Sequence, residues 1–482
     1  MPARTGAAFL AGLKDGRELW LGDERVDDPA SHPALVGAAW AIADVFDLHH
    51  AHPEDCLMPD PETGEPIAVS HMIPRSRSDL EQRHRALERV AEFSVGLMGR
   101  TPDYVNVTFA GFAGDAAAWA AYGNDRGAEA LVAYQAHMAR ADLSLTHAIV
   151  HQTVDKARGP VPAGFDPVQL HKVADTAHGI VVRGSRVLAT LAPFADDMAV
   201  YPAAPMPDAD PRHALCFSIP MNTPGLKLLC RDSVSLLGNR FDHPLSSRFD
   251  EQDAFVIFDD VEVPRDRLFI DGNLAVYNSA VRTTWWPNIL QQTMIRAQVK
   301  LEFAWGLATL MTEAIGSHTP PVQQMLGEIW TFGALARAAI RAAEVDARDP
   351  GNGMWYCDLP PLVALRTSFP RWFPRVNEIY RELGAHNLLT TPSTAQLADP
   401  ALRPLLERYL GGVGDIDAER RSRIFRLAWD FAGTGLASRN EQYERFYLGS
   451  AGRNLMQAHQ RMDRTRATSL VERFLQEPLD PA

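Results

Sequence analysis

Apolar residues recur at helical spacing over the first part of the chain. This spacing predicts one helix at 36–48 and a second that opens at Ser78-Asp79-Leu80-Glu81, a capping-box sequence, and ends at Gly99. Two alanine-rich helices are predicted around 115–122 and 127–141. Residues 1–140 are therefore predicted to form a helical domain.

The period changes at Leu143, from which apolar and polar residues alternate as they do in strands. Further short runs have the same character, and Gly184-Ser185 between two of them suits a tight hairpin turn. The predicted strands are 143–151, 170–176, 179–183, 186–191, 198–201, 214–219, 226–231 and 254–261. Short strands separated by Gly and Pro predict a small antiparallel barrel or sandwich at 141–275.

Helical spacing returns after Asp271-Gly272-Asn273 and continues to the end of the chain. The predicted helices are 289–316, 323–345, one that opens at Pro360-Pro361, 415–431 and 440–448. Long helices with comparatively short links predict a bundle, which we assign to 276–482. The predicted fold class is α+β and mainly α, in the order helical domain, β domain, helical bundle.

The charge of the chain excludes some classes of partner. Aspartate and glutamate number 60 against 47 lysines and arginines, a net charge of −13. This balance argues against a broad surface for nucleic acid or anionic membranes. No apolar run of about 18 residues and no signal-peptide core occur. The four cysteines are scattered without a Cys-x-x-Cys pair, which favours a reducing cytoplasm over a disulfide framework or a zinc site.

The most distinctive chemistry lies at 99–106, where Arg100 and Tyr104 stand four residues apart after a predicted helix. Arginine is a permanent cation with five N–H donors, and tyrosine can donate or accept a hydrogen bond. Together they suit an oxygen-rich, partly anionic group. Taken alone, the pair has a more common structural explanation, in which a helix end carries an arginine–carboxylate bridge and a half-buried tyrosine.

Five segments, in the same order along nearly the whole chain, resemble the reduced-flavin-dependent 4-hydroxyphenylacetate 3-hydroxylase family. They are Arg100-Thr101-Pro102-Asp103-Tyr104-Val105-Asn106, Leu143-Ser144-Leu145-Thr146-His147, the run from Thr223-Pro224-Gly225-Leu226-Lys227 to Cys230-Arg231, Phe241-Asp242-His243-Pro244-Leu245-Ser246-Ser247-Arg248-Phe249-Asp250-Glu251, and Ser438-Arg439-Asn440-Glu441-Gln442-Tyr443-Glu444-Arg445-Phe446.

The resemblance implies an acyl-CoA dehydrogenase-like fold, with an α domain, a β-barrel and a four-helix bundle, commonly assembled as a tetramer. It also implies the oxygenase component of a two-component monooxygenase, to which a separate reductase supplies FADH2 made with NADH. O2 would then form a flavin C4a-hydroperoxide that hydroxylates a phenolic or similar electron-rich aromatic substrate ortho to its hydroxyl. The expected partners are that substrate, O2 and the reductase, with no nucleic acid, membrane or resident metal.

The same resemblance assigns candidate site residues. Arg100, Tyr104 and His147 match the positions that bind the substrate hydroxyl, where His147 can accept the phenolic proton. Gln152, Thr153 and Thr190 match flavin-ring positions, although Val150-His151-Gln152 stands where the family usually has Asn-Pro-Gln. The loop at 238–248 matches the segment that closes over flavin and substrate, through Phe241, His243, Ser246, Ser247 and Arg248. A core histidine, strand threonines and a solvated loop are the structural alternatives.

Other functions remain open from the sequence. The 4-hydroxybutyryl-CoA dehydratases resemble this fold but hold an iron–sulfur cluster, and the matching ligand positions here carry Arg100, Tyr104, Gln292 and Val299. An acyl-CoA dehydrogenase-like flavoenzyme needs a catalytic carboxylate, for which Glu328 and Glu302 are only nominal candidates. A non-catalytic helical interaction protein is the third alternative. The substrate stays open, with variable loops predicted at 160–165 and 203–212.

Overall fold

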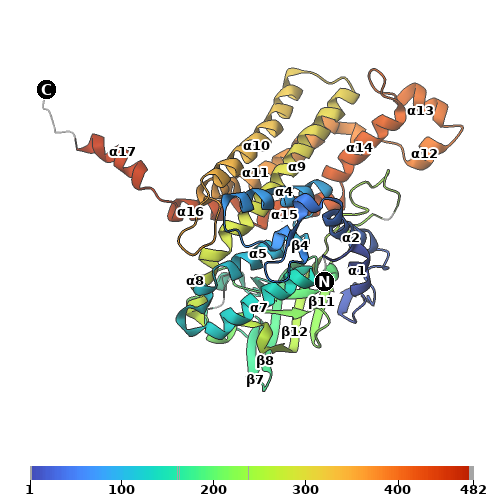
Figure 1. Cartoon of the computed structure of the whole chain (residues 1–482). Coiled ribbons are helices and arrows are strands. Elements are labelled where there is room, and N and C mark those ends of the chain that lie inside the picture. The colour runs from blue at the N-terminus through green and yellow to red at the C-terminus, as the bar shows by residue number, and fades with distance from the viewer. Residues whose placement is uncertain (1–2, 160, 162, 237, 477–482) are drawn as a thin grey trace, which may run out of the picture.

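The structure is a computed structural model and describes residues 3–159, 161, 163–236 and 238–476. Residues 160 and 162 of the predicted variable loop at 160–165 lie outside this described part. Figure 1 shows the strands gathered at one end of the molecule and the long C-terminal helices at the other, with α4, α5 and α7 between them. The mainly helical α+β class is thus as predicted.

Most of the strands belong to two open sheets. The seven-stranded sheet has the order β2-β1-β11-β12-β8-β6, with β7 also paired to β8, and the four-stranded sheet has the order β13-β10-β9-β5. Their bounds are β1 Glu18–Leu21, β2 Glu24–Arg25, β5 Leu145–His147, β6 Val150–His151, β7 His171–Asp175, β8 Gly179–Thr190, β9 Asp197–Val200, β10 Leu215–Pro220, β11 Leu226–Cys230, β12 Asp253–Pro264 and β13 Leu268–Asp271. Among the described residues neither sheet closes on itself, so no closed barrel is found and the domain layout stays a prediction.

Two other features of the strands differ from what the sequence indicated. The larger sheet recruits β1, which pairs in parallel with β11 although about two hundred residues separate them in sequence, and local patterning gives no sign of this pairing. Gly184-Ser185 is not a hairpin turn, because it lies inside the single strand β8. Gly184 has φ +121°, and a Cβ there would lie 2.5 Å from the carbonyl oxygen of Gln169. The glycine therefore allows a close backbone approach rather than a chain reversal.

The region around Arg100 also differs from prediction. Helix α4 (Arg77–Phe93) is capped by Ser76, whose hydroxyl accepts from the Asp79 amide, and not by Ser78. It ends at Phe93, short of Gly99, because Val95 and Gly96 turn the backbone left-handed at φ 48° and 70°. Pro102 then begins a new buried helix, α5 (Pro102–Gly114), since proline suits the first helical position. Tyr104 consequently lies in the first turn of α5, and Arg100 precedes that helix.

The remaining predicted helices are present, with boundaries shifted by a few residues. They are α2 Val36–Ala51, α6 Ala116–Ala120, α7 Asp125–Ala141, α9 Trp286–Ala314, α10 Pro320–Val345, α11 Leu359–Gly384, α14 Ala418–Ala432 and α15 Gly435–Phe446. Additional helices are α1 Gly6–Gly12, α3 Pro53–Cys56, α8 Leu274–Thr284, α12 Thr394–Ala398, α13 Arg403–Leu410, α16 Ala451–Arg461 and α17 Thr465–Leu475, and a small hairpin joins β3 Leu57–Pro59 to β4 Pro66–Ala68.

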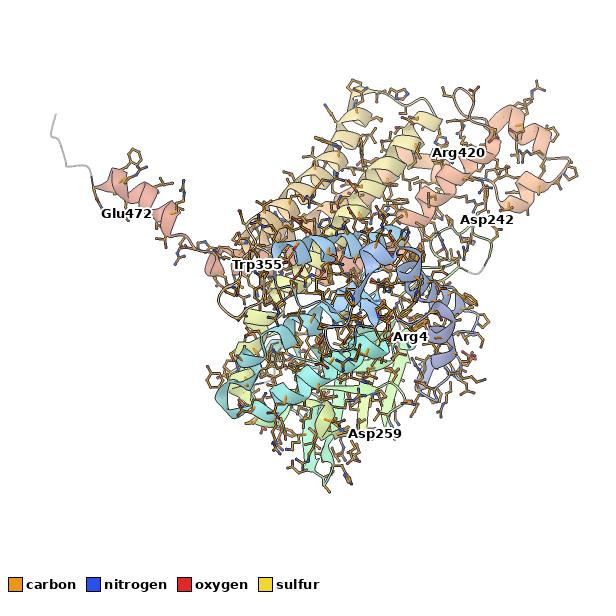
Figure 2. All side chains as sticks on the ribbon, in the orientation of Figure 1. Arg4, Asp242, Asp259, Trp355, Arg420 and Glu472 are labelled. Atoms are coloured by element: carbon orange, nitrogen blue, oxygen red, sulfur yellow. The ribbon has the colours of Figure 1, made fainter. Side chains whose placement is uncertain are left out.

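Helix α9 runs through the centre of the molecule. Every residue at 287–301 is buried, because this part of α9 is covered by α4, α5 and the helices of the C-terminal half. A helix that is buried all round has no single polar face, as its mixture of Ile, Leu, Met and amide side chains shows. By contrast, α17 stands clear of the body, with Glu472 and its neighbours open to solvent (Figure 2). No helix in the described part of the chain is long and apolar enough to cross a membrane.

Candidate active site

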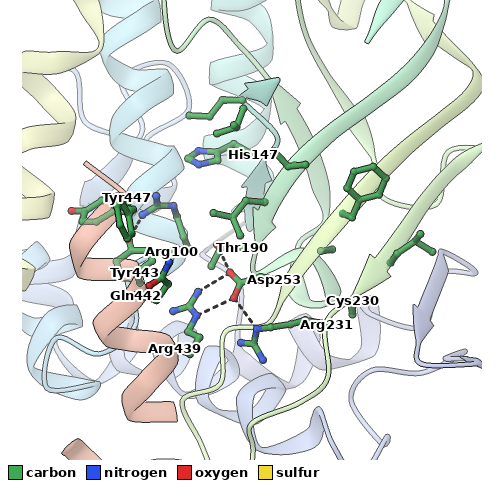
Figure 3. A pocket seen from close by; sticks show the side chains of 18 residues that line it. Arg100, His147, Thr190, Cys230, Arg231, Asp253, Arg439, Gln442, Tyr443 and Tyr447 are labelled. Atoms are coloured by element: carbon green, nitrogen blue, oxygen red, sulfur yellow. Dashed lines mark hydrogen bonds and ion pairs between the residues drawn. The ribbon is translucent and has the colours of Figure 1, made fainter. Parts of the chain in front are cut away.

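A cavity of about 750 Å³ lies between the larger sheet and α15 (Figure 3). Strands β8, β11 and β12 supply one wall, α15 supplies the opposite wall, and Arg100 and His147 enter from the sides. The lining residues are Arg100, His147, Ile149, Val150, Val187, Leu188, Thr190, Leu229, Cys230, Arg231, Asp253, Ala254, Phe255, Arg439, Gln442, Tyr443, Phe446 and Tyr447. Residues remote in sequence therefore meet at one concave site, as a ligand site requires.

Arg100 is held from several sides. Its backbone N–H donates to Glu251 Oε1 at 2.5 Å, and its Nη1 donates to the carbonyl of Gly99 at 3.0 Å and to the Tyr443 hydroxyl. The guanidinium carbon lies 3.9 Å from the centroid of the Tyr104 ring, within cation–π distance. Its Nε is buried and has no hydrogen-bond partner among the described residues. Aromatic contacts, rather than an ion pair with a carboxylate, therefore orient the Arg100 side chain.

The surroundings of Arg100 and Tyr104 determine the charge states of these two side chains. Burial opposes the positive charge of Arg100, but the phenols around it and Glu251 outweigh burial and raise its pKa further. Burial raises the pKa of Tyr104 to about 12, against the opposing influence of Arg100. At neutral pH the site therefore presents a permanent cation beside a protonated phenol that can donate a hydrogen bond.

His147 lies on β5 and completes this cluster. Its Nδ1 is 2.5 Å from the Tyr201 hydroxyl, and its ring centroid is 5.4 Å from that of Tyr104. Burial, and then the charge of Arg100, hold its pKa well below the ordinary value of 6.5. The imidazole is therefore neutral at pH 7. Because Nδ1 is engaged by Tyr201 and Nε2 has no partner among the described residues, Nε2 is the atom left to exchange a proton with a ligand.

A buried ion network forms the floor of the cavity. The Asp253 carboxylate accepts from Thr190 Oγ1 at 2.6 Å, from Arg439 Nη2 at 2.7 Å and from Arg231 Nε at 2.9 Å. Arg439 also binds Glu251 at 2.9 Å, which links this network to the backbone of Arg100. Burial alone would raise the pKa of Asp253, but Arg439 and Arg231 hold it well below its ordinary value. The network is charge-paired and locks α15 against the sheet.

We expect Arg439→Met to lower the free energy of unfolding by about 3–5 kcal/mol, because the fully buried Glu251 and the partly buried Asp253 would lose their shared cation. Urea unfolding at pH 7 measures this. Arg445→Met on the same helix is the matched control, since Arg445 is 44 % exposed and pairs with Glu441 on the helix surface. Its expected loss is at most about 0.5 kcal/mol. Equal losses for the two variants would contradict a structural role for the network.

The chain matches two protein-family models. One is described as 4-hydroxyphenylacetate 3-hydroxylase N terminal and matches residues 5–270, and the other is described as its C terminal and matches residues 279–476. The chain belongs to this family. The resemblance noticed in the sequence is thereby confirmed.

Close relatives of this 4-hydroxyphenylacetate 3-hydroxylase family member are known. The 4-hydroxyphenylacetate 3-monooxygenase oxygenase component of Thermus thermophilus is 35 % identical over 99 % of this chain and 98 % of its own length. A crystal structure of such an oxygenase component, complexed with FAD and 4-hydroxyphenylacetate, superposes with a TM-score of 0.92 at 34 % identity, covering 98 % of each chain.

The dehydratase alternative shares the fold with this family member. An archaeal 4-hydroxybutyryl-CoA dehydratase from N. maritimus superposes with a TM-score of 0.88 over 100 % of this chain and 97 % of its own, at only 18 % identity. In the present structure Arg100 and Tyr104 stack on each other, and Gln292 donates to Asp103 at 2.9 Å. None of these side chains is a thiolate or imidazole that could ligate an iron–sulfur cluster.

The other residues predicted for the site of this family member are placed differently. Gln152 and Thr153 follow β6 and do not line the cavity, whereas Thr190 does. Tyr104 is also absent from the lining, although its ring contacts Arg100 and His147. The loop that holds Phe241, His243, Ser246, Ser247 and Arg248 does not line it either. The loop packs against α14 instead, because Asp430 accepts from the Leu245 and Ser246 amides, and Arg423 covers the Phe241 ring at 4.4 Å. Within this one chain, the loop is therefore not brought to the candidate site.

Sequence reasoning also missed one wall of the cavity. Arg439, Gln442, Tyr443, Phe446 and Tyr447 project from α15 and its C-terminal end. Tyr443 and Tyr447 stack at a centroid distance of 4.3 Å, and below them Glu444 is bound by Arg296 and Lys300. The segment 438–446 was among the five that resemble the family, and its i, i+4 spacing of Arg439 and Tyr443 was the available signal.

Proposed function

We propose that this chain is the oxygenase component of a two-component flavin monooxygenase that hydroxylates a phenol, or a similar electron-rich aromatic ring, ortho to its hydroxyl. The observation that carries the proposal is that Arg100 and neutral His147 line one large cavity, with the buried ring of Tyr104 packed against both. In the overall reaction FADH2 is oxidised to FAD, one atom of O2 enters the ring, and the other leaves as water.

The cavity fits a flavin. Val150, Leu188 and Leu229 line it and are 46 %, 52 % and 38 % exposed, so three apolar side chains face the cavity without protein cover. An extended aromatic ring would cover them, which the hydrophobic effect favours. Thr190 and the ion network at Asp253 offer polar contacts at one edge. Bound reduced flavin supplies the activation of O2, and the residues of this chain position the other reactant.

Arg100, Tyr104 and His147, which we call the clamp, have distinct roles in this proposal. Arg100 holds the phenol oxygen and stabilises the negative charge that develops when the phenol loses its proton. Tyr104, which remains protonated, donates a hydrogen bond to that oxygen. In the tautomer whose Nδ1–H donates to the Tyr201 oxygen, Nε2 of the neutral His147 ring carries the free lone pair and accepts the phenolic proton. Ionisation makes the ortho carbon more electron-rich, and burial of the cluster excludes water.

The proposal is tested by reconstitution. Purified chain is mixed with FAD, NADH, a generic flavin reductase and a panel of phenols that includes 4-hydroxyphenylacetate. We expect an ortho-hydroxylated product with little hydrogen peroxide for at least one phenol, measured by chromatography and a peroxide assay. Complete conversion of the consumed NADH into hydrogen peroxide for every phenol, with reduced FAD bound, would argue against the monooxygenase. The same panel identifies the arene that the site accepts.

Three broader features belong to the same proposal. The segments 1–140, 141–275 and 276–482 would act as the three domains of an acyl-CoA dehydrogenase-like layout, and the mutual packing of α9, α10, α11 and α14 supports a bundle in the last of them. A separate reductase would supply the reduced flavin. A reducing cytoplasm is the proposed compartment, and the presence of four unpaired cysteines supports it.

We further propose a homotetramer in which α17 contacts another copy of the chain. Leu470, Val471 and Phe474 repeat at helical spacing on α17 and are 45 %, 57 % and 70 % exposed. An apolar stripe on a helix that leaves its own body favours burial against a partner (Figure 1). We expect the double variant Leu470→Glu, Phe474→Glu to reduce the assembly size in light scattering. Ser469→Glu, on the polar side of α17, is the control, and loss of assembly in it alone would contradict this role.

A further inference from the structure

Strand β8 departs from regular strand geometry where it forms a wall of the candidate active site. Side chains alternate between the two faces of a regular strand, yet the neighbours Val187 and Leu188 both line the cavity. The residues on either side of this pair, Arg186 and Ala189, are buried and do not line it. The strand therefore carries an extra residue at this point of the wall.

The pairing of β8 with β12 locates the extra residue. Strand β12 has one residue, Phe255, between its pairs at Ala254 and Val256. Strand β8 has two residues, Val187 and Leu188, over the same interval. This arrangement is a β-bulge, and bulges next to active sites are known to redirect a side chain. Here the bulge directs Leu188 into the cavity.

Leu188 is an unusual residue for this position. Its φ is +64°, in the left-handed region that suits glycine, asparagine and aspartate, whereas a bulky side chain there is strained against its own backbone. A second bulge in the same strand pair follows the usual preference, because its left-handed residue is Asp260, at φ +55°. Asp260 accepts two hydrogen bonds from Arg183, at 2.8 and 2.7 Å. Leu188, by contrast, presents an apolar side chain that is 52 % exposed.

Leu188 joins two other apolar side chains on this wall. Val150 on β6 and Leu229 on β11 also line the cavity and are exposed. Backbone strain and open apolar surface each destabilise the chain on their own. A ligand with an extended apolar surface offsets the second of these by covering the three side chains. Strain of this kind is concentrated at functional sites, where it holds a side chain in the position that a ligand requires.

We propose that Leu188 positions the reduced flavin, because the bulge holds its side chain against the space that the isoalloxazine ring would occupy. This inference rests on the proposed function and assigns one residue of the wall a specific part in it. Thr190 lies two residues further along β8 and lines the same cavity. One short segment thus offers an apolar contact and a polar contact to the same ligand.

The strain is tested in the ligand-free chain with glycine and alanine variants, which both remove the apolar side chain. Glycine is less stable than alanine at a regular strand position, and the order reverses at a left-handed position. We expect the Tm of Leu188→Gly to exceed that of Leu188→Ala by about 1–2 °C. Leu229→Gly and Leu229→Ala are the matched pair, since Leu229 lines the same wall without a left-handed backbone, and they should show the opposite order.

Flavin binding is measured under argon by titrating the full chain with FAD reduced by dithionite. We expect Leu188→Ala to raise the Kd about tenfold, because about half of a leucine side chain would no longer be buried by the ligand. Leu188→Met keeps the apolar bulk and should recover most of the lost affinity. Asp260→Gly, which alters the second bulge outside the cavity, should retain the wild-type Kd.

The possible outcomes separate this inference from the proposed function. The inference is overturned if Leu188→Ala binds reduced FAD with the wild-type Kd, or if Leu188→Gly has a lower Tm than Leu188→Ala. It is also overturned if Leu188→Ala raises KM for the phenol and leaves the Kd for reduced FAD unchanged, because Leu188 would then contact the aromatic substrate. Failure of the wild-type chain to bind reduced FAD would refute the proposed function itself, and this inference with it.

Discussion

Arg100→Gln is expected to lower kcat for hydroxylation by about 10²–10³-fold, the effect of removing a charged donor from a developing oxyanion. Glutamine retains N–H donors but loses the permanent charge that favours phenolate over phenol. Uncoupling should accompany the loss, so that NADH consumption continues and hydrogen peroxide replaces hydroxylated product. Product and peroxide are measured together under saturating phenol and FAD.

The structure suggests controls for the Arg100→Gln experiment. Glu251 binds the backbone N–H of Arg100, and this bond persists whatever the side chain, so the variant should fold. Arg100→Lys keeps a charge but cannot stack over Tyr104 as a planar group, and should recover only part of the activity. Tyr443→Phe removes the hydroxyl that accepts a hydrogen bond from Arg100, and so tests separately whether this bond orients the Arg100 side chain. If Arg100→Gln still converts NADH consumption into hydroxylated product as efficiently as the wild type, Arg100 does not have the proposed role.

The sequence pointed to Arg100 and His147 as candidate site residues but gave no sign of the geometry around them. Arg100 and His147 belong to family segments and do meet at the cavity, because α5 and β5 pack on each other. No helix was predicted at 102–114, although it carries Tyr104, because a proline such as Pro102 is compatible either with the end of one helix or with the beginning of another. Nothing local distinguishes the two, since the decision depends on whether the following apolar residues are buried by α7 and α9.

The errors at longer range have a similar origin. Asp430 binds the Leu245 and Ser246 amides from 185 and 184 residues away, so the contiguous sequence of this loop says nothing about where the loop packs. The parallel pairing of β1 with β11 was missed for the same reason. Arg439 and Tyr443 look like one face of an ordinary amphipathic helix until the sheet opposite them supplies Asp253. Each of these contacts joins segments that are far apart in the sequence. Hydrophobic periodicity indicates which face of an element is buried, but not which distant segment covers it.

His147→Gln is expected to reduce hydroxylation by about 10²–10⁴-fold, the usual contribution of a positioned general base. Glutamine fills much of the same volume and can still bind Tyr201, but it cannot take up the phenolic proton. The wild-type pH profile should support this role. Because burial and Arg100 hold the pKa of His147 well below 6.5, the ring stays neutral under mildly acidic conditions, and the acidic limb of kcat should lie below pH 6.5.

His151→Gln is the matched control. His151 lies four residues further on, is also buried, and has a pKa that burial likewise holds well below 6.5, but it does not line the cavity. Its variant should retain the wild-type kcat and acidic limb. Both histidines bind fewer protons when folded than when unfolded, so their contribution to stability falls as the pH drops below about 6.5 toward the folded pKa values. Each variant should therefore weaken the loss of unfolding free energy between pH 7.5 and 5.5.

The stability change is shared by the two variants, whereas the change in rate belongs to His147 alone, and this separates catalysis from burial. Tyr201→Phe refines the test, because it frees Nδ1 of His147 without changing the burial of the ring. We then expect a moderate decrease in kcat for hydroxylation and a shift of the acidic limb of its pH profile. If His147→Gln and His151→Gln lower kcat equally, the effect comes from packing of the strands, and the phenolic proton must leave by another route.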